Sequence, residues 1–279
     1  MQASYILGTK AVGDQGVLSP DEEIALLYRI GFGAFFTEAR EDLIPRFAAA
    51  ARDVGIAYAS VHSGCLAHFM WGEYGTEDDS AAAQKKALRE IELCSEFEIP
   101  YLVLHPSVGS REEAPPEIGY ERYAQLFRRA EQCGVTLAFE NLSSKKYLEA
   151  IMKTFGDSPA CGFCYDSGHA LAYTNGTDLL KLYQKHLVLT HLHDNFGRRG
   201  DRITSDDDLH IFPFDGLVDW DFVAGSLKAA SYTGILMAEV KYSPTPGNYI
   251  YDTYNAPSLE QFYQTVYERL LRIEDRILK

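Results

Sequence analysis

Short apolar segments alternate with segments of helical pattern along the whole chain of 279 residues. This alternation is typical of a parallel sheet whose strands are connected by helices. Eight apolar segments of strand length occur, at residues 4–9, 34–38, 56–61, 101–105, 135–140, 162–166, 187–191 and 234–239. They predict an α/β fold, a (β/α)8 TIM barrel that forms a single domain over residues 1–279.

The segments between these predicted strands carry the residues that start and end helices. Ser19 and Pro20 precede three acidic residues, and Gly31 ends the same stretch, as helix termini prefer. Gly55 ends the next stretch in the same way. Helices are predicted near residues 20–30, 42–53, 76–97, 145–155, 177–186, 220–230 and 258–279, with a further helix after Pro116.

Six of the predicted strands end in a histidine or a carboxylate. These residues are His62, His105, Glu140, Asp166, His191 and Glu239. In a barrel of parallel strands, all carboxyl ends meet on the face where TIM-barrel enzymes hold their active sites. Imidazoles and carboxylates are metal ligands, and such a cluster is costly without a cation. The register therefore predicts a metal site rather than a purely structural barrel.

The segment from Leu189 to His210 adds further ligand types after the seventh strand. His191 and His193 lie on an extended stretch, and we expect only one of them to face the cleft. Asp208 and His210 form an Asp-x-His pair that an irregular loop can return to the same place. The alternative is a solvated acidic loop in which the histidines are incidental.

Four short motifs at the strand ends carry a family resemblance. They are Glu-Asn-Leu at 140–142, Asp-Ser-Gly-His at 166–169, His-Leu-His-Asp-Asn at 191–195, and Glu239. Together they resemble the xylose isomerase-like TIM-barrel superfamily over essentially the whole chain. This superfamily contains sugar and sugar-phosphate isomerases and epimerases, inosose dehydratases and zinc apurinic endonucleases.

The resemblance to the sugar-acting members implies one divalent ion held by Glu140, Asp166, His191 and Glu239. Three carboxylates and one imidazole suit Mn²⁺, Mg²⁺ or Co²⁺. The implied reaction is isomerisation or epimerisation of a sugar or sugar phosphate through a metal-stabilised ene-diolate. Glu140 or Glu239 would take the proton next to the carbonyl, and His169 would bind a substrate oxygen. Dehydration of a cyclic polyol starts from the same proton abstraction and is an alternative.

Five further residues match the ligands with which apurinic endonucleases hold a three-zinc cluster. They are His62, His105, His169, Asp208 and His210. On this mapping up to three Zn²⁺ bind, Glu140 bridges two of them, and a phosphodiester is hydrolysed. The chain has ENLSS where the endonucleases have ENTAG, and Leu209 stands where they have an arginine. Residues 215–220 resemble a loop of sugar epimerases, so we favour the sugar enzyme.

The charge of the chain decides which partners are expected. The formal net charge is −14, and three Zn²⁺ would add +6 and leave −8. DNA would therefore meet a repulsive surface. We expect a small sugar or polyol as substrate and no nucleic acid. No membrane is expected either, because no apolar run has membrane-spanning length. A homo-oligomer is an open alternative, since dimers and tetramers are common among the relatives that the resemblance implies.

The five cysteines are an odd number, and the N-terminus has no signal pattern, which indicates a reducing cytoplasm rather than disulfide bonds. Cys161 and Cys164 form a C-x-x-C motif, which can be a redox or zinc motif. They lie on a predicted strand, where residues three apart point to opposite faces. We therefore interpret both as packing residues.

Several residues are candidates for binding the substrate. They are His169, His62, Trp71, Lys241 and Arg198. Trp71 lies in a loop with His68 and Tyr74 that could close over a sugar ring, and Lys241 shares a strand face with Glu239. Arg198, with Arg199 and Arg202, could hold a phosphate. The alternatives are a loop cluster or a subunit contact for the aromatic residues and a solvated charged loop for the arginines.

Overall fold

The computed structural model describes residues 4–13, 17–64, 67–73, 75–107, 114–174, 177–200, 204 and 207–279. Its centre is a sheet of eight parallel strands in the order β7-β6-β5-β4-β3-β2-β1-β8. The strands are β1 (Ile6–Lys10), β2 (Ala34–Glu38), β3 (Ala57–His62), β4 (Tyr101–Leu104), β5 (Thr136–Glu140), β6 (Cys161–Asp166), β7 (Leu187–His191) and β8 (Ile235–Ala238). The predicted strands are confirmed in number and order.

Contacts between β7 and β8 close this sheet into a barrel. Leu192, directly after β7, forms a parallel bridge with Ala238. The Leu192 N–H donates to the Met237 carbonyl at 2.8 Å, and the Glu239 N–H donates to the Leu192 carbonyl at 3.2 Å. Because all strands are parallel, closure brings their carboxyl ends to one face. The predicted α/β TIM barrel is confirmed.

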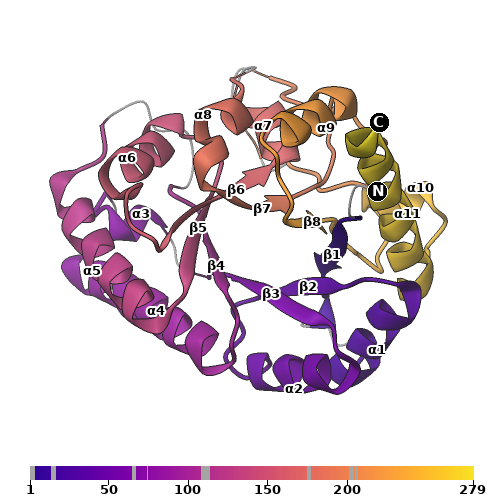
Figure 1. The fold of residues 1–279 in the computed structure, drawn as a ribbon, viewed down its shortest axis with the longest axis horizontal. Coiled ribbons are helices and arrows are strands. Elements are labelled where there is room, and N and C mark those ends of the chain that lie inside the picture. Colours follow the sequence, from indigo (N-terminus) through magenta and orange to yellow (C-terminus); the bar gives the residue numbers. More distant parts are fainter. Residues whose placement is uncertain are drawn as a thin grey trace.

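Helices surround the strands, as Figure 1 shows. The long ones are α1 (Pro20–Ile30), α2 (Ile44–Val54), α4 (Glu77–Glu96), α5 (Glu117–Cys133), α6 (Lys145–Phe155), α9 (Trp220–Ala229) and α11 (Leu259–Leu278). Short helices α3 (Ala67–Met70), α7 (Ser167–Tyr173), α8 (Leu179–Tyr183) and α10 (Tyr249–Thr253) lie in the connections, with a 3-10 turn at Gln184–His186. Across the described ranges, every helix is too short or too polar to cross a lipid bilayer.

Several helices begin where the sequence places a capping residue. The side chains of Ser19, Thr76 and Ser258 each accept a backbone N–H three residues further on, at the starts of α1, α4 and α11. Each cap satisfies an N–H group that has no partner inside the helix. Local sequence therefore sets these helix starts.

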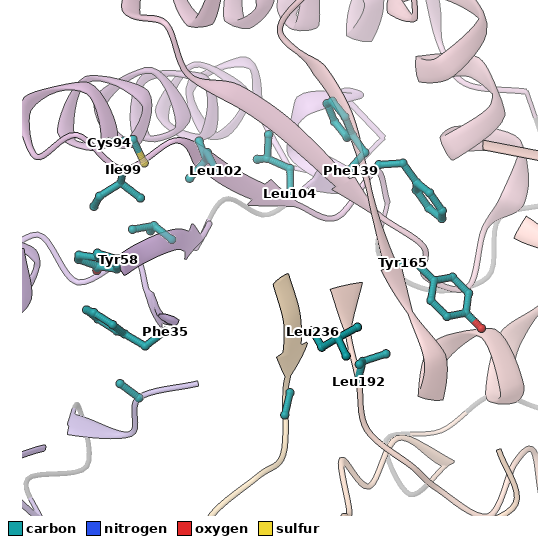
Figure 2. Close-up of a cluster of buried hydrophobic side chains, with 14 of the residues drawn as sticks. Phe35, Tyr58, Cys94, Ile99, Leu102, Leu104, Phe139, Tyr165, Leu192 and Leu236 are labelled. Atoms are coloured by element: carbon teal, nitrogen blue, oxygen red, sulfur yellow. The ribbon is translucent and has the colours of Figure 1, made fainter. Parts of the chain in front are cut away.

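The main hydrophobic core lies between the strands and the surrounding helices. Figure 2 shows part of it, with Phe35 of β2 and Tyr58 of β3 stacked at a centroid distance of 4.5 Å and Cys94 contributed by α4. Two smaller clusters are made by strand residues alone: one contains Ala34, Phe36, Ala59 and Met237, the other Val103, Ala138, Cys164 and Leu189. The Phe36 ring stacks on His191 at 4.6 Å, so one of these clusters supports a predicted ligand from below.

Cys161 and Cys164 are buried on β6. The four cysteines that the structure describes are all free thiols. Cys164 belongs to one of the strand clusters, and Cys161 packs in the main core. Their positions agree with the interpretation that both are packing residues.

Candidate metal centre

A cavity of about 460 Å³ opens at the carboxyl ends of the strands. Five of its lining residues end a strand or directly follow one, and the others come from the connections beyond the strand ends. The lining residues are Lys10, Val12, Glu38, His62, His105, His169, Asp208, His210, Glu239, Val240, Lys241 and Tyr242. Three of the six residues predicted from the strand ends, His62, His105 and Glu239, therefore line one cavity.

A central group of ligand types adjoins this cavity through Glu239, which lines it. Glu140, Asp166, His191 and Glu239 are buried, and one ligand atom of each lies within 4.8 Å of the others. Nδ1 of His191 is 3.1 Å from Oε1 of Glu140 and 3.0 Å from Oε2 of Glu239. Three buried carboxylates need a positive counter-charge, so the donor set fits a divalent cation.

A second group shares Glu140 with the first. The second carboxylate oxygen of Glu140, Oε2, lies 3.1 Å from Nε2 of His62 and 3.2 Å from Nε2 of His105. Nδ1 of His62 lies 3.3 Å from the Ser63 carbonyl, and a hydrogen bond there leaves the Nε2 lone pair for another partner. Glu140 is thus placed to serve two groups.

A third group lies beside the cavity mouth and contains His169, His193, Asp208 and His210. Nε2 of His169 and Nε2 of His210 are each 3.2 Å from an oxygen of Asp208. On the opposite side of each ring, Nδ1 donates to a backbone carbonyl, that of Asn141 at 3.0 Å for His169 and that of Glu239 at 2.9 Å for His210. Histidine ligands of metals are usually oriented by such outer hydrogen bonds.

The expectation that only one of His191 and His193 faces the cleft is wrong. Both His191 and His193 face the site, because residues two apart on an extended segment point to the same side. The His193 ring stacks on His210 at 3.8 Å, and its Nε2 is 3.0 Å from Oδ2 of Asp166. Gly168 makes room for this ring, since a Cβ there would lie 2.1 Å from Cε1 of His193. The Asp-Ser-Gly-His motif thus supplies His169 and, through its glycine, also leaves space for the His193 ring.

Helix α7 starts inside the site. Asp166 ends β6 and also caps α7, because its Oδ1 accepts the His169 N–H at 2.6 Å. Its other oxygen, Oδ2, remains directed toward His193. One carboxylate therefore fixes the helix that carries His169 and contributes to the central group.

Some buried polar atoms of the site lack a hydrogen bond within the described part of the chain. They are Nε2 of His105, Oδ2 of Asp166, Nε2 of His191, Nε2 of His193 and Oδ1 of Asp208. All but Nε2 of His191 have a polar neighbour at 3.0–3.2 Å that is not aligned for a hydrogen bond. Buried polar atoms without partners are costly, and a cation would satisfy them. These atoms support metal binding by the residues present.

The pKa shifts of the buried residues also support a cation site. Burial alone would raise the pKa of Glu239, but the charges of His191 and Lys10 lower that pKa well below its usual range. Burial alone would lower the pKa of His191, yet the groups beside it, Cys164, Glu239 and Glu140, raise that pKa well above its usual range. Without a cation, protonated imidazoles thus balance the carboxylates. A divalent cation would take over this role and displace protons.

A loop between β7 and α9 returns Asp208 and His210 to the strand ends. Asp194 is fully buried and accepts four N–H groups, from the backbones of Asn195, Phe214 and Val218 and from Nε1 of Trp220, at 2.9–3.0 Å. Its own backbone pairs with Ile211 in both directions at 3.0 Å. This buried carboxylate therefore holds both ends of the loop.

Two charged residues of the site were missed by the sequence analysis. The Lys10 ammonium contacts Oε1 of Glu38 and lies 3.4 Å from Oε1 of Glu239. Burial would lower the pKa of Lys10, but Glu239 and Glu38 outweigh it and raise that pKa. Lys10 and Glu38 end β1 and β2. The rule that selected histidines and carboxylates at strand ends would have found Glu38, but it does not include lysine.

The predicted substrate-binding residues fall into two sets. His62, His169 and Lys241 line the cavity. Trp71 does not, and this expectation is wrong: its indole is fully buried, donates from Nε1 to the Pro106 carbonyl at 2.7 Å, and packs against tyrosines. Arg198 is exposed, and its Nε donates to the Gly200 carbonyl at 2.8 Å, which agrees with a charged surface loop. Tyr74, Arg202 and the His68 side chain lie outside the described residues.

The fold and the site define this protein as a (β/α)8 barrel with a polar, ligand-rich centre at the carboxyl ends of its strands. Residues 24–259 match the family described as xylose isomerase-like TIM barrel, and the chain belongs to this family. The predicted family is therefore confirmed.

Comparisons with individual proteins agree with this assignment. The uncharacterized protein y4fM of Sinorhizobium fredii is 29% identical over 200 residues, which are 67% of this chain and 58% of that protein. A xylose isomerase domain protein from Planctomyces limnophilus superposes with a TM-score of 0.74 at 13% identity, over 100% of this chain and 99% of the other.

Sugar epimerases are among the similar structures. D-psicose 3-epimerase from Clostridium cellulolyticum H10, solved with D-tagatose, has a TM-score of 0.74 at 16% identity over 99% of both chains. The 3-keto-D-glucoside 4-epimerase YcjR from E. coli has a TM-score of 0.70 at 14% identity, over 96% of this chain and 99% of the other. At these identities the likeness shows a shared fold.

Proposed function

We propose that this protein is a metal-dependent isomerase or epimerase of a sugar or sugar phosphate. The observation that carries the proposal is the central group, Glu140, Asp166, His191 and Glu239, which adjoins a cavity of about 460 Å³ that Glu239 lines. Cavities of this size take small molecules. Structures of the same fold were solved with D-allulose and with D-tagatose, which supports a sugar as the ligand here.

The central group would hold a divalent cation such as Mn²⁺, Mg²⁺ or Co²⁺. When bound, such an ion polarises a carbonyl group and so makes the neighbouring C–H bond more acidic. The residues around it then decide where the proton goes. The lowered pKa values of Glu140 and Glu239 keep both in the carboxylate form, which is the form that accepts a proton.

In this proposal one of these glutamates takes the proton from the carbon next to the carbonyl. The other returns a proton to the opposite face of the same carbon in an epimerase, or to the adjacent carbon in an isomerase. His169 lines the cavity, and it hydrogen-bonds a substrate oxygen. Lys241 and His62 contribute further polar contacts from the cavity wall.

The experiment that tests this proposal is proton exchange in D₂O. Metal-loaded protein is incubated with ketohexoses and with ketose phosphates, and loss of the proton next to the carbonyl is followed by ¹H NMR. We expect exchange with at least one substrate, and removal of the metal by a chelator should stop it. A full panel without exchange contradicts the proposal, and a new double bond in the product would indicate dehydration instead.

A specific observation favours a second candidate function, a multinuclear metal hydrolase of phosphodiesters. The groups around His62 and around Asp208 lie beside the central group, and Glu140 belongs both to the central group and to the group around His62. Three Zn²⁺ per chain by elemental analysis, together with cleavage of abasic-site DNA, would support it. The net charge of −14 disfavours DNA as the substrate. One ion per chain without cleavage would support the sugar enzyme.

A further inference from the structure

We propose that Lys10 is a further catalytic residue of this site, and that its ammonium group hydrogen-bonds the substrate oxygen on which negative charge develops. This inference rests on the proposed sugar isomerase or epimerase function. It assigns a role to a residue outside the ligand groups and outside the family motifs described above.

The first observation is the position of Lys10 in the barrel. It ends β1, and closure of the sheet puts β1 between β2 and β8. The side chain therefore lies between Glu38, which ends β2, and Glu239, which directly follows β8. It lines the cavity, and 23% of the side chain is exposed there.

The second observation concerns the hydrogen-bond donors of the ammonium group. A lysine ammonium has three N–H donors. Within the described residues, it makes two hydrogen bonds, to Oε1 of Glu38 and to Oε1 of Glu239. One donor is left on a group that borders the cavity. A neutral oxygen of a ligand in the cavity can accept it without displacing either carboxylate.

The third observation is the way Glu239 uses its two oxygens. Oε2 lies 3.0 Å from Nδ1 of His191, on the side of the central ligand group, and Oε1 lies 3.4 Å from the Lys10 ammonium. Lys10 thus contacts the central group through the Glu239 carboxylate, which lies between Lys10 and His191. A substrate oxygen that approaches the central group also comes near this cation.

A second cation can assist the proposed reaction, because negative charge develops on a substrate oxygen. When a glutamate takes the proton, the C–H electron pair forms a carbon–carbon double bond and the carbonyl electron pair moves onto oxygen. Lys10 keeps its own proton and donates a charge-assisted hydrogen bond to that oxygen, which is stronger than a neutral one. Because the ammonium is held in advance by Glu38 and Glu239, little reorganisation is needed when the charge appears.

The test compares Lys10→Met, Lys10→Arg and Lys228→Met in the exchange assay. Loss of one such donor typically costs on the order of 100-fold in kcat, and we expect this loss for Lys10→Met. Lys10→Arg keeps the positive charge and should recover part of it. Lys228 is an exposed residue of α9, so Lys228→Met should match the unmodified protein. Metal per chain, Mn²⁺ affinity, thermal unfolding and KM are measured in parallel.

A fall in kcat with retained metal content, fold and KM, and partial recovery in Lys10→Arg, supports the role. Exchange by Lys10→Met within about threefold of the unmodified protein overturns it and leaves the proposed function standing. Equal loss of metal and activity in both Lys10 variants would show that Lys10 only shapes the metal site, which also overturns the role. If the unmodified protein exchanges no substrate, the proposed function and this inference fall together.

Discussion

Replacing Asp194 by alanine should both destabilise the protein and disturb the third ligand group, which contains His169, His193, Asp208 and His210. The carboxylate is fully buried and accepts four N–H groups at 2.9–3.0 Å. Alanine leaves these four donors without their partner. Two of them, the backbone N–H groups of Phe214 and Val218, belong to the segment that follows His210, so the loop that carries His210 loses its anchor.

The magnitude follows from the number of bonds lost. A buried donor without its partner costs roughly 1–3 kcal/mol. Four donors in one network do not add fully, and water can enter part of the space that alanine leaves, so we expect a loss of about 4 kcal/mol. For a urea dependence of about 3 kcal/mol per M, this moves the unfolding midpoint down by roughly 1.3 M.

The assay is urea unfolding followed by tryptophan fluorescence, with metal content measured on the same samples. One of the two tryptophans, Trp220, donates directly to Asp194, so its emission reports on this place. Asp221→Ala is the matched control: its side chain is 86% exposed and pairs with Arg276, so its loss should cost at most about 0.5 kcal/mol.

Two results would refute the reasoning about Asp194. One is a midpoint shift no larger than that of Asp221→Ala, which would mean that the four hydrogen bonds contribute little. The other is the full loss of stability with unchanged metal binding by the third group, which would mean that His210 and Asp208 do not depend on this anchor. We expect Asp194→Asn to fall between alanine and the unmodified protein, because its amide keeps one oxygen acceptor.

Three further changes test other parts of the site. Gly168→Ala places a Cβ 2.1 Å from the His193 ring, so it should cost about 1–3 kcal/mol and weaken metal binding, and unchanged unfolding would contradict the packing described here. Glu239→Gln should keep the fold but lower proton exchange at least about 100-fold, and undiminished exchange would exclude Glu239 as a base. In chelator-treated protein, burial alone would lower the pKa of His169, but the carboxylates around the ring raise that pKa. The stability that protonated His169 contributes is therefore full below about pH 6.5 and is lost as the pH rises through the raised pKa. Unfolding of chelator-treated protein that shows no such loss would contradict the role of these carboxylates.

The sequence was sufficient for the fold because its signals are local. Capping serines such as Ser19 and Ser258 and glycines such as Gly31 act within a few residues, and so do the apolar runs of strand length, which occur eight times along the chain. The site residues at the strand ends could be predicted from the sequence for the same reason. Selecting histidines and carboxylates at strand ends placed His62 and Glu239 at the site, and applied to every strand it would have added Glu38 but not Lys10.

Only the tertiary structure decided which of the remaining candidates reach the cavity. Trp71 and Lys241 both looked suitable for a sugar, yet packing of α3 against its neighbours buries the indole, whereas Lys241 follows β8 at the open end of the barrel. Asp208 and His210 reach the strand ends because Asp194 holds their loop. These outcomes depend on contacts between residues distant in the sequence, whose energies are fixed only once the barrel has closed, and no local pattern encodes them.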